Sequence, residues 1–295
     1  MTDSGTARDS ALGRERRRPS RAVAGLALAC HPGPAVAVTA LVTALAAIGG
    51  RGAAGLPVVT AAVLTGQLSV GWCNDAVDAP RDAATGRMDK PIVTGRVGAG
   101  TVRAAAFAAL ALCVPLSLAC GVVAGLVHLA AVGAAWAYNL RLKSTLLSWL
   151  PYAVGFGAVP AFVATGLPGR PWPAWWAVLA GALLGCGAHL GNVLPDIAGD
   201  MATGVRGWPQ RLGPRRVRIL LPLPLLAASV LLVLAPPGPA GPVRWAALGV
   251  VCLCTAAGAL LGGRSPRVPF AAAVAAAAVD VALLAATGTG VLTTS

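Results

Sequence analysis

Long apolar runs, separated by short segments rich in Gly, Pro and Arg, dominate this 295-residue sequence. A helix needs about 20 apolar residues to cross the hydrocarbon core of a bilayer. Only 11% of the residues are charged, whereas a soluble domain carries roughly 25%. The sequence therefore predicts an all-α fold, a polytopic membrane bundle of about nine transmembrane helices. The predicted spans lie near residues 34–50, 55–73, 104–118, 120–138, 149–166, 174–194, 218–236, 243–262 and 268–292.

The basic residues are distributed unevenly over this pattern. With the N-terminus in the cytosol, 20 of the 23 Lys and Arg residues fall in cytosolic segments, and only Arg51, Arg170 and Arg244 fall outside. Such a bias is typical of cytoplasmic loops. We therefore attribute the net charge of +13 to topology and anionic lipid, and we expect no nucleic acid partner. The bias predicts a multi-pass protein of the plasma membrane with a cytosolic N-terminus. Residues 1–30 are expected to be a disordered basic tail.

Acidic residues are scarce and clustered. Of the ten, four follow the second predicted span, namely Asp75, Asp78, Asp82 and Asp89, and two follow the sixth, namely Asp196 and Asp200. Both clusters lie in the longest polar loops, near residues 74–103 and 195–217, and the topology places both in the cytosol. The chemistry is therefore expected to face the cytosol.

The first cluster reads NDAVDAPRDAATGRMDKP. On a helix, Asn74, Asp78 and Asp82 share one face, because residues four apart are neighbours. An oxygen-rich stripe suits Mg²⁺, which uses one or two carboxylates together with substrate phosphates. The alternative is a solvated helix end. Pro80 predicts that the helix kinks or ends within the stripe.

The second cluster reads HLGNVLPDIAGD, and its spacing places His189, Asn192, Asp196 and Asp200 on one face. Pro195 is again expected to perturb the helix. His189 either contacts substrate or is a polar residue packed against a neighbouring helix. Asp280 stands alone in the last span, where an ionisable residue is a functional candidate. A hydrogen-bonded core Asp is the alternative.

Basic residues follow each acidic cluster. Carboxylates alone repel a diphosphate, but carboxylates with Mg²⁺ and a rim of Lys and Arg bind it and stabilise the leaving group. Each basic residue alone could instead be a topology determinant. The candidates are Arg87, Lys90 and Arg96, then Arg141 and Lys143, then Arg206 and Arg211.

These elements resemble the UbiA superfamily of intramembrane prenyltransferases, and the similarity covers nearly the whole chain in order and spacing. The family motif NDxxDxxxD with a following Arg is matched by Asn74, Asp75, Asp78, Asp82 and Arg87. The next elements match at Lys90, Pro91, Gly95 and Arg96, at Tyr138, Leu142 and Lys143, and at Asp196, Asp200, Gly204, Leu212 and Gly213.

The resemblance implies a UbiA-like prenyltransferase domain over residues 31–295, with both Asp motifs holding a Mg²⁺-diphosphate above a cavity open to lipid. It implies catalytic and metal-binding roles for Asp75, Asp78, Asp82, Asp196 and Asp200. Substrate-binding roles are expected for Asn74, Arg87, Lys90, Arg96, Tyr138, Lys143, His189 and Asn192.

The implied reaction is Mg²⁺-dependent transfer of a prenyl group from an allylic polyprenyl diphosphate to an acceptor, expected to be aromatic or similar to a quinone precursor. The sequence departs from the family at Pro195 and at Gly207–Trp208, so the acceptor is not carried over. Two alternatives remain. A UbiA-type terpene cyclase would need no acceptor, and a secondary transporter would hold its acids nearer the midplane.

Overall fold

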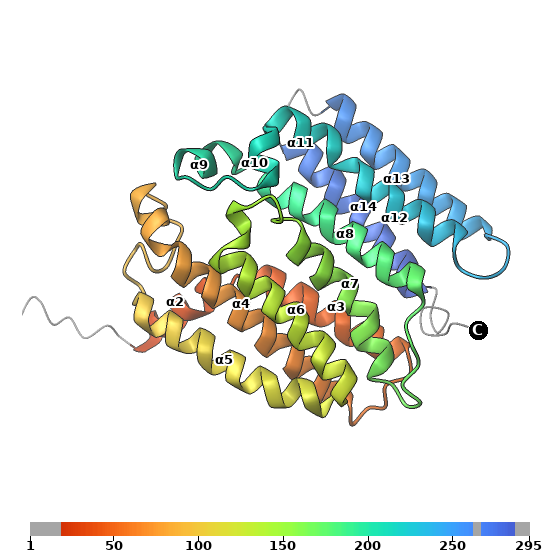
Figure 1. The fold of residues 1–295 in the computed structure, drawn as a ribbon, viewed down its shortest axis with the longest axis horizontal. Coiled ribbons are helices and arrows are strands. Elements are labelled where there is room, and N and C mark those ends of the chain that lie inside the picture. The colour runs from red at the N-terminus through yellow and green to blue at the C-terminus, as the bar shows by residue number, and fades with distance from the viewer. Residues whose placement is uncertain (1–18, 262–266, 287–295) are drawn as a thin grey trace, which may run out of the picture.

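The computed structural model describes residues 19–261 and 267–286, and every regular element in these two ranges is a helix (Figure 1). The predicted all-α class is therefore confirmed. The first half contains α2 (Pro19–Ala29), α3 (Pro32–Ile48), α4 (Leu56–Ala84), α5 (Ala99–Ala119), α6 (Val122–Leu140) and the 3₁₀ turn η1 (Leu142–Ser144). The second contains α7 (Leu150–Thr165), α8 (Trp175–Val193), α9 (Ile197–Ala202), α10 (Trp208–Leu212), α11 (Pro214–Leu220), α12 (Pro222–Leu234), α13 (Pro242–Leu261) and α14 (Arg267–Ala286).

All nine predicted apolar runs coincide with helices, although the end of the last run, residues 287–292, lies outside the described residues. Seven helical segments in the described chain are long and apolar enough to cross a membrane. An eighth is added if α2 from Arg21 and α3, bent by 61° relative to each other, count as one broken span. Helix α7 has only 16 residues, about 24 Å of rise. The chain is thus a multi-pass membrane protein, and nine spans is an approximate number.

The long helices pack as neighbours in a single bundle (Figure 1). Helix α4 lies against α3, α5 and α6, while α8 lies against α12 and α14. Helix α7 contacts both α6 and α8, so it joins the first group of helices to the second. One apolar cluster extends from Val42 on α3 through Phe162 on α7 to Leu232 on α12, which makes the two groups one folding unit.

Small residues allow the close approach of α7 and α8. A Cβ atom on Gly181 would lie 2.7 Å from the carbonyl oxygen of Phe156, so only glycine permits this backbone contact. Such small-residue contacts are typical of helix pairs in membranes. The predicted tight hairpin between the third and fourth spans is also present, where Gly121 adopts a φ of 124° between α5 and α6.

Helix α2 lies inside the segment predicted to be a disordered tail, and that prediction does not hold for residues 19–29. The helix is held by tertiary contacts that the local sequence does not reveal. The indole N–H of Trp72 donates to the carbonyl of Leu26 at 2.8 Å, and Ala29 packs with Val97 and Val102. Residues 1–18 lie outside the described residues.

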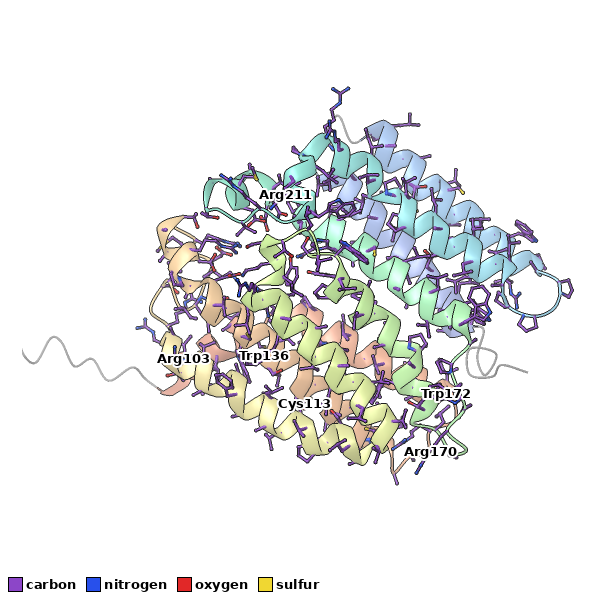
Figure 2. All side chains as sticks on the ribbon, viewed as in Figure 1. Arg103, Cys113, Trp136, Arg170, Trp172 and Arg211 are labelled. Carbon is purple, nitrogen blue, oxygen red and sulfur yellow. The ribbon has the colours of Figure 1, made fainter. Side chains whose placement is uncertain are left out.

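The two ends of the bundle differ in charge. Figure 2 shows Arg103 and Arg211 at one end and Arg170 with Trp172 at the other. Arg103 and Arg211 belong to the segments predicted to be cytosolic, and Arg170 belongs to a predicted outer loop. Arg103 and Arg211 therefore lie at the opposite end of the bundle from Arg170.

Arg51 has a structural role at the end of the bundle that carries few charges. It follows α3, and its guanidinium donates to the carbonyl of Cys120 at 3.3 Å and to the carbonyl of Gly166. These carbonyls lie at the C-terminal ends of α5 and α7, where the last C=O groups of a helix have no partner within it. Arg51 therefore ties three segments together.

We expect Arg51→Ala to lower the stability of the detergent-solubilised protein by about 1–3 kcal/mol, because two helix-end carbonyls lose a charged donor. The apparent melting temperature measures this effect. Arg103→Ala is the matched control, because Arg103 is exposed on α5. Equal melting temperatures for the two variants would contradict the structural role of Arg51.

Candidate functional site

Helix α4 carries the first acidic cluster beyond the membrane-spanning part of the helix. Its 29 residues rise about 43 Å, more than the roughly 30 Å of a hydrocarbon core. The helix continues to Ala84 with Pro80 inside it, so of the two predicted effects of Pro80 the helix end is absent. The hydroxyl of Thr85 donates to the carbonyls of Arg81 and Asp82 at 3.0 and 3.3 Å and holds the last turn.

Asp78 is the most connected carboxylate of the cluster. It is 7% exposed, and it pairs with Lys143 of η1 and with Arg81 at 3.0 Å. The side-chain amide of Asn74 donates to the same carboxylate at 3.3 Å. Asn74, Asp78 and Lys143, predicted as neighbours from three motif positions, are therefore brought together.

Arg81 joins the two acidic clusters. Besides Asp78, its guanidinium lies 3.6 Å from a carboxylate oxygen of Asp200 on α9. One arginine thus bridges carboxylates that are 122 residues apart in the sequence, counted from Asp78 to Asp200. The predicted juxtaposition of the two clusters at one end of the bundle is observed.

Asp75 faces a different set of partners. Its carboxylate, 2% exposed, accepts from the ammonium of Lys90 at 2.8 Å and lies 3.7 Å from the imidazole of His31. Lys90 and His31 are themselves 3.3 Å apart. His31 lies at the break between α2 and α3 with a φ of 56°, so the break between these two helices contributes a side chain to this site.

The second cluster does not form one continuous helical face. Helix α8 ends at Val193 and α9 begins at Ile197, because Pro195 cannot continue the hydrogen-bond ladder. Asp196 is exposed at the start of α9, whereas Asp200 accepts from the side chain of Gln210 at 2.8 Å. The predicted alignment of His189, Asn192, Asp196 and Asp200 is therefore interrupted, although the predicted effect of Pro195 is confirmed.

Charge from the basic loop reaches both clusters. Burial raises the pKa of the Asp200 carboxyl, while the hydrogen bond from Gln210 and the charge of Arg81 oppose that rise. Arg87 pairs with exposed Asp89 at 3.0 Å. This hydrogen bond raises the pKa of Arg87, and the charges of Asp82 and Asp196 act in the same direction. Arg96 is exposed, and no ion pair joins it to another described residue.

A polar and aromatic layer lies next to the charged network. The ring of Tyr152 lies 5.2 Å from Tyr138 and 4.9 Å from His189, measured between centroids. The amide of Asn192 donates to the Tyr152 hydroxyl at 3.1 Å. Three predicted substrate-binding residues, Tyr138, His189 and Asn192, therefore gather around Tyr152.

His189 is held by a buried hydrogen bond. Its Nε2 lies 3.1 Å from the hydroxyl of Ser148, and this hydroxyl also accepts from the backbone N–H of Trp208 at 3.2 Å. His189 is 1% exposed, and its Nδ1 atom has no hydrogen-bond partner in the described structure. His189 is thus packed in the interior, and its Nδ1 atom remains available to accept or donate a hydrogen bond beside Tyr138 and Tyr152.

The carboxylate oxygens of the two acidic clusters are the candidate ligands for Mg²⁺. Among the described residues no three His, Cys, Asp or Glu side chains converge as a ready metal cluster. Asp75 and Asp82 nevertheless each have a buried carboxylate oxygen without a hydrogen-bond partner in that part of the chain. Mg²⁺ takes one or two carboxylates and completes its shell with water and phosphate oxygens. The residues therefore fit a metal that arrives together with a phosphate ligand.

Several residues of the site were missed by sequence reasoning. Arg81 is one of the 20 basic residues that the sequence assigns to cytosolic segments, although its position three residues after Asp78 also predicts an ion pair on a helix. The others are not motif positions, and tertiary packing alone brings them to Asp75, Asn74, Tyr138 or Asp200. They are His31, Asn139, Tyr152 and Gln210.

Asp280 on α14 is fully buried and belongs to a different part of the bundle. The hydroxyl of Ser229 on α12 donates to its carboxylate at 2.5 Å. This contact joins two packed helices and favours the interpretation of Asp280 as a hydrogen-bonded core residue.

The chain resembles known proteins both in sequence and in fold. The sequence model of the UbiA prenyltransferase family matches residues 35–268. No curated protein matches the chain significantly. A UbiA homologue from Archaeoglobus fulgidus bound to DMAPP and Mg²⁺ superimposes with a TM-score of 0.66 at 16% identity, over 90% of this chain and 99% of that one.

Two further solved structures show the same fold. The Archaeoglobus fulgidus homologue bound to GPP and Mg²⁺ gives a TM-score of 0.66 at 16% identity, over 89% of this chain and 98% of that one. A digeranylgeranylglyceryl phosphate synthase gives 0.69 at 14% identity, over 90% and 98%.

Asn139 generates a prediction about how the first motif is held. It is 3% exposed, it accepts from Asn74 at 3.1 Å and it donates to the carbonyl of Val70 at 3.0 Å. We expect Asn139→Leu to lower stability by about 1–3 kcal/mol, because two buried polar groups lose their partner. Thermal unfolding in detergent measures this loss. Asn192→Leu, at an exposed position, is the comparison, and an equal loss in both variants would contradict the prediction.

Proposed function

The chain belongs to the UbiA prenyltransferase family, and on that premise we propose that it transfers a prenyl group from an allylic polyprenyl diphosphate to an acceptor in a Mg²⁺-dependent reaction. The observation that carries this proposal is the bridge formed by Arg81 between Asp78 and Asp200. It brings two separate carboxylate clusters and their cations to one end of an apolar bundle.

Five of the six carboxylates in the two clusters, all except that of Asp89, are the proposed metal ligands. Asp75 and Asp82 support this role because each has a buried oxygen without a partner. Asp78 and Asp200 already lie within one ion-paired network, and Asp196 is exposed at the start of α9. When bound, Mg²⁺ would neutralise negative charge on the leaving diphosphate.

The basic residues around the carboxylates are proposed to bind the diphosphate itself. Lys143, Lys90 and Arg81 are each paired with a carboxylate in the described structure. An arriving diphosphate offers these cations an alternative anion, so the same side chains could hold its oxygens. Arg87 and Arg96, both exposed at this end, would add positive charge that attracts the anion.

The reaction requires cleavage of the bond between the allylic carbon and the diphosphate oxygen, and the electron pair leaves with the diphosphate. Positively charged donors that already face the site stabilise the developing charge without reorganisation. The acceptor is proposed to be aromatic or similar to a quinone precursor. It would lie beside Tyr138, Tyr152 and His189, whose ring centroids are 4.9–5.9 Å apart. Asn192 of the same layer would contact the acceptor.

The orientation of the protein is part of the proposal. We infer that it lies in the plasma membrane with its N-terminus and the acidic clusters on the cytosolic side, supported by the basic residues at that end of the bundle. Residues 31–295 would form one catalytic domain. Within residues 1–30, α2 would be an ordered part of that domain, because His31 and Trp72 connect it to the site.

The direct experiment incubates the purified protein in detergent with geranyl diphosphate or longer prenyl diphosphates, with Mg²⁺ or with EDTA. Prenylated product formed from a membrane lipid extract only in the presence of Mg²⁺ supports the proposal. Cyclic hydrocarbon formed without any acceptor would identify a terpene cyclase instead. Failure to consume any diphosphate under all of these conditions would contradict both.

We expect Asp78→Asn and Asp196→Asn each to reduce Mg²⁺-dependent diphosphate consumption at least about a hundred-fold, because each removes an anionic metal ligand. Release of inorganic diphosphate measures this rate. Asp89→Asn is the matched control, since its ion pair with Arg87 is exposed and exposed pairs contribute little. Full activity of either cluster variant would refute the assigned roles.

A further inference from the structure

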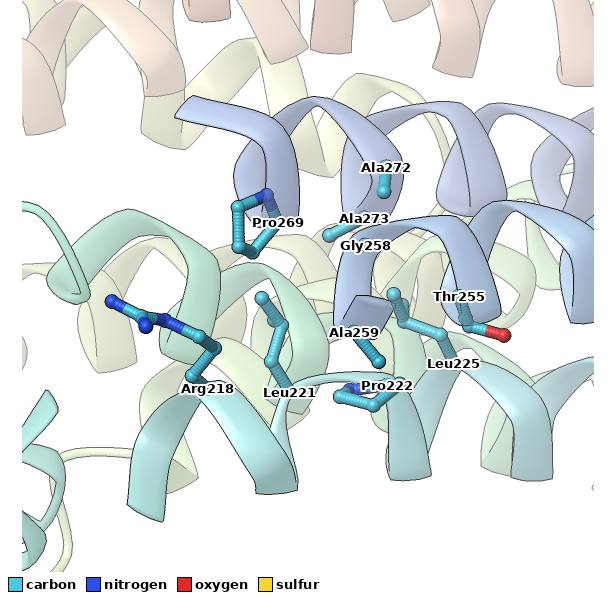
Figure 3. A pocket seen from close by; sticks show the side chains of 10 residues that line it. All are labelled: Arg218, Leu221, Pro222, Leu225, Thr255, Gly258, Ala259, Pro269, Ala272 and Ala273. Atoms are coloured by element: carbon cyan, nitrogen blue, oxygen red, sulfur yellow. The ribbon is translucent and has the colours of Figure 1, made fainter. Parts of the chain in front are cut away.

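A shallow apolar groove lies away from the acidic clusters, between the ends of α11, α12, α13 and α14 (Figure 3). Its walls include Leu221, Leu225, Ala259 and Pro269, and Arg218 is the one charged residue among the described residues that line it. Thr255 also lines it, but the Thr255 hydroxyl is already hydrogen bonded to the carbonyl of Val251 at 2.9 Å. The groove therefore offers apolar surface with one cationic group.

Arg218 lacks an anionic partner. No hydrogen bond or ion pair joins its side chain to another residue in the described ranges, and its Nε atom is buried without a partner there. Between residues 201 and 279 the sequence has eight arginines and no Asp or Glu. The sequence that flanks Arg218 therefore supplies no carboxylate.

The surroundings of the groove are apolar and face outward. Leu223 on α12 is 55% exposed and Leu260 on α13 is 82% exposed. In a multi-pass membrane protein, exposed apolar side chains of this kind contact lipid. The floor is made of small residues, since a Cβ atom on Gly258 would lie 2.9 Å from the Cβ atom of Ala272. Gly258 and Ala272 both line the groove, so small side chains form this part of its surface.

We propose that this groove binds an anionic phospholipid, with an acyl chain on the apolar floor and the phosphate at the Arg218 guanidinium. Charge complementarity selects this occupant. The site combines lipid-facing apolar surface with an unpaired cation, and Arg215 and Arg216 are exposed on the same helix, α11. Basic pockets between transmembrane helices are known to bind anionic headgroups. A prenyl diphosphate fits less well, because none of the described residues that line the groove is a carboxylate that could hold its Mg²⁺.

The lipid would contact four helices at once, since residues of α11, α12, α13 and α14 line the groove. Helix α11 directly follows α10, which carries Gln210, the donor to Asp200. A lipid held at Arg218 would therefore stabilise the arrangement of α11 against α13 and α14 without entering the proposed active site.

The test uses the full-length protein in detergent and native mass spectrometry, with phosphatidylglycerol and phosphatidylcholine of identical acyl chains as probes. We expect tighter binding of phosphatidylglycerol by the wild type. Arg218→Gln should weaken that binding about five-fold, the change that corresponds to the loss of one basic contact at a membrane surface. Arg218→Lys should restore part of the loss. Ala259→Phe, which fills an exposed part of the groove, should weaken binding of both lipids.

Arg216→Gln is the matched control, because Arg216 is exposed on α11 and does not line the groove. We expect it to change binding by less than about two-fold, since exposed charges are largely screened. Equal effects of Arg216→Gln and Arg218→Gln would indicate general surface charge and overturn the proposal. No preference for phosphatidylglycerol in the wild type would also overturn it.

Two competitors exclude other sources of the anion. Displacement of the lipid by millimolar inorganic phosphate would assign the site to a free anion, and displacement by geranyl diphosphate without Mg²⁺ would assign it to substrate. Either result overturns the proposal. Binding is measured without turnover, so its outcome is independent of the proposed prenyl transfer.

Discussion

The ion pairs of Asp78 organise the functional end of this bundle. A carboxylate that is only 7% exposed requires a partner, because an uncompensated buried charge is strongly destabilising. The partners come from Lys143 of η1 and from Arg81 one helical turn further along α4. Arg81 extends the chain of charges to Asp200 of α9. Three elements that are distant in the sequence are thereby joined at one end of the membrane-spanning helices.

The layer beneath these charges is polar but uncharged. The Ser148 hydroxyl contacts His189 on α8 and accepts from the backbone of Trp208 at the start of α10. The same short helix carries Gln210, which donates to Asp200. The hydrogen bond from Trp208 to Ser148 anchors α10. Because Gln210 of α10 donates to Asp200, this anchor also helps to position the Asp200 carboxylate in the ion-paired layer. The rings of Tyr138 and Tyr152 belong to the same layer, because both contact the ring of His189.

The sequence predicts the parts of the structure that depend on local chemistry. Apolar runs locate the helices, and Pro195 predicts the break before Asp196. Pro80, with the same chemistry, does not end α4, which continues to Ala84. The sequence does not reveal which distant side chains meet. His31 reaches Asp75 only because α2 packs on Trp72, and Gln210 reaches Asp200 only because α10 is anchored at Ser148.

The same cations serve two electrostatic demands under the proposed function. Without substrate, Lys90, Lys143 and Arg81 neutralise Asp75, Asp78 and Asp200, whose carboxylates would otherwise repel one another at a low-dielectric boundary. A ligand that brings both divalent cations and phosphate anions satisfies the carboxylates and the basic groups together. Each carboxylate then exchanges a Lys or Arg partner for the metal ion, and each Lys or Arg exchanges a carboxylate for a phosphate oxygen. A free diphosphate or a free metal ion offers only half of that exchange. The paired network therefore favours the metal-diphosphate complex over either component, so recognition of the prenyl donor rests on its diphosphate end, while the uncharged layer around Tyr152 and His189 is left to discriminate among acceptors.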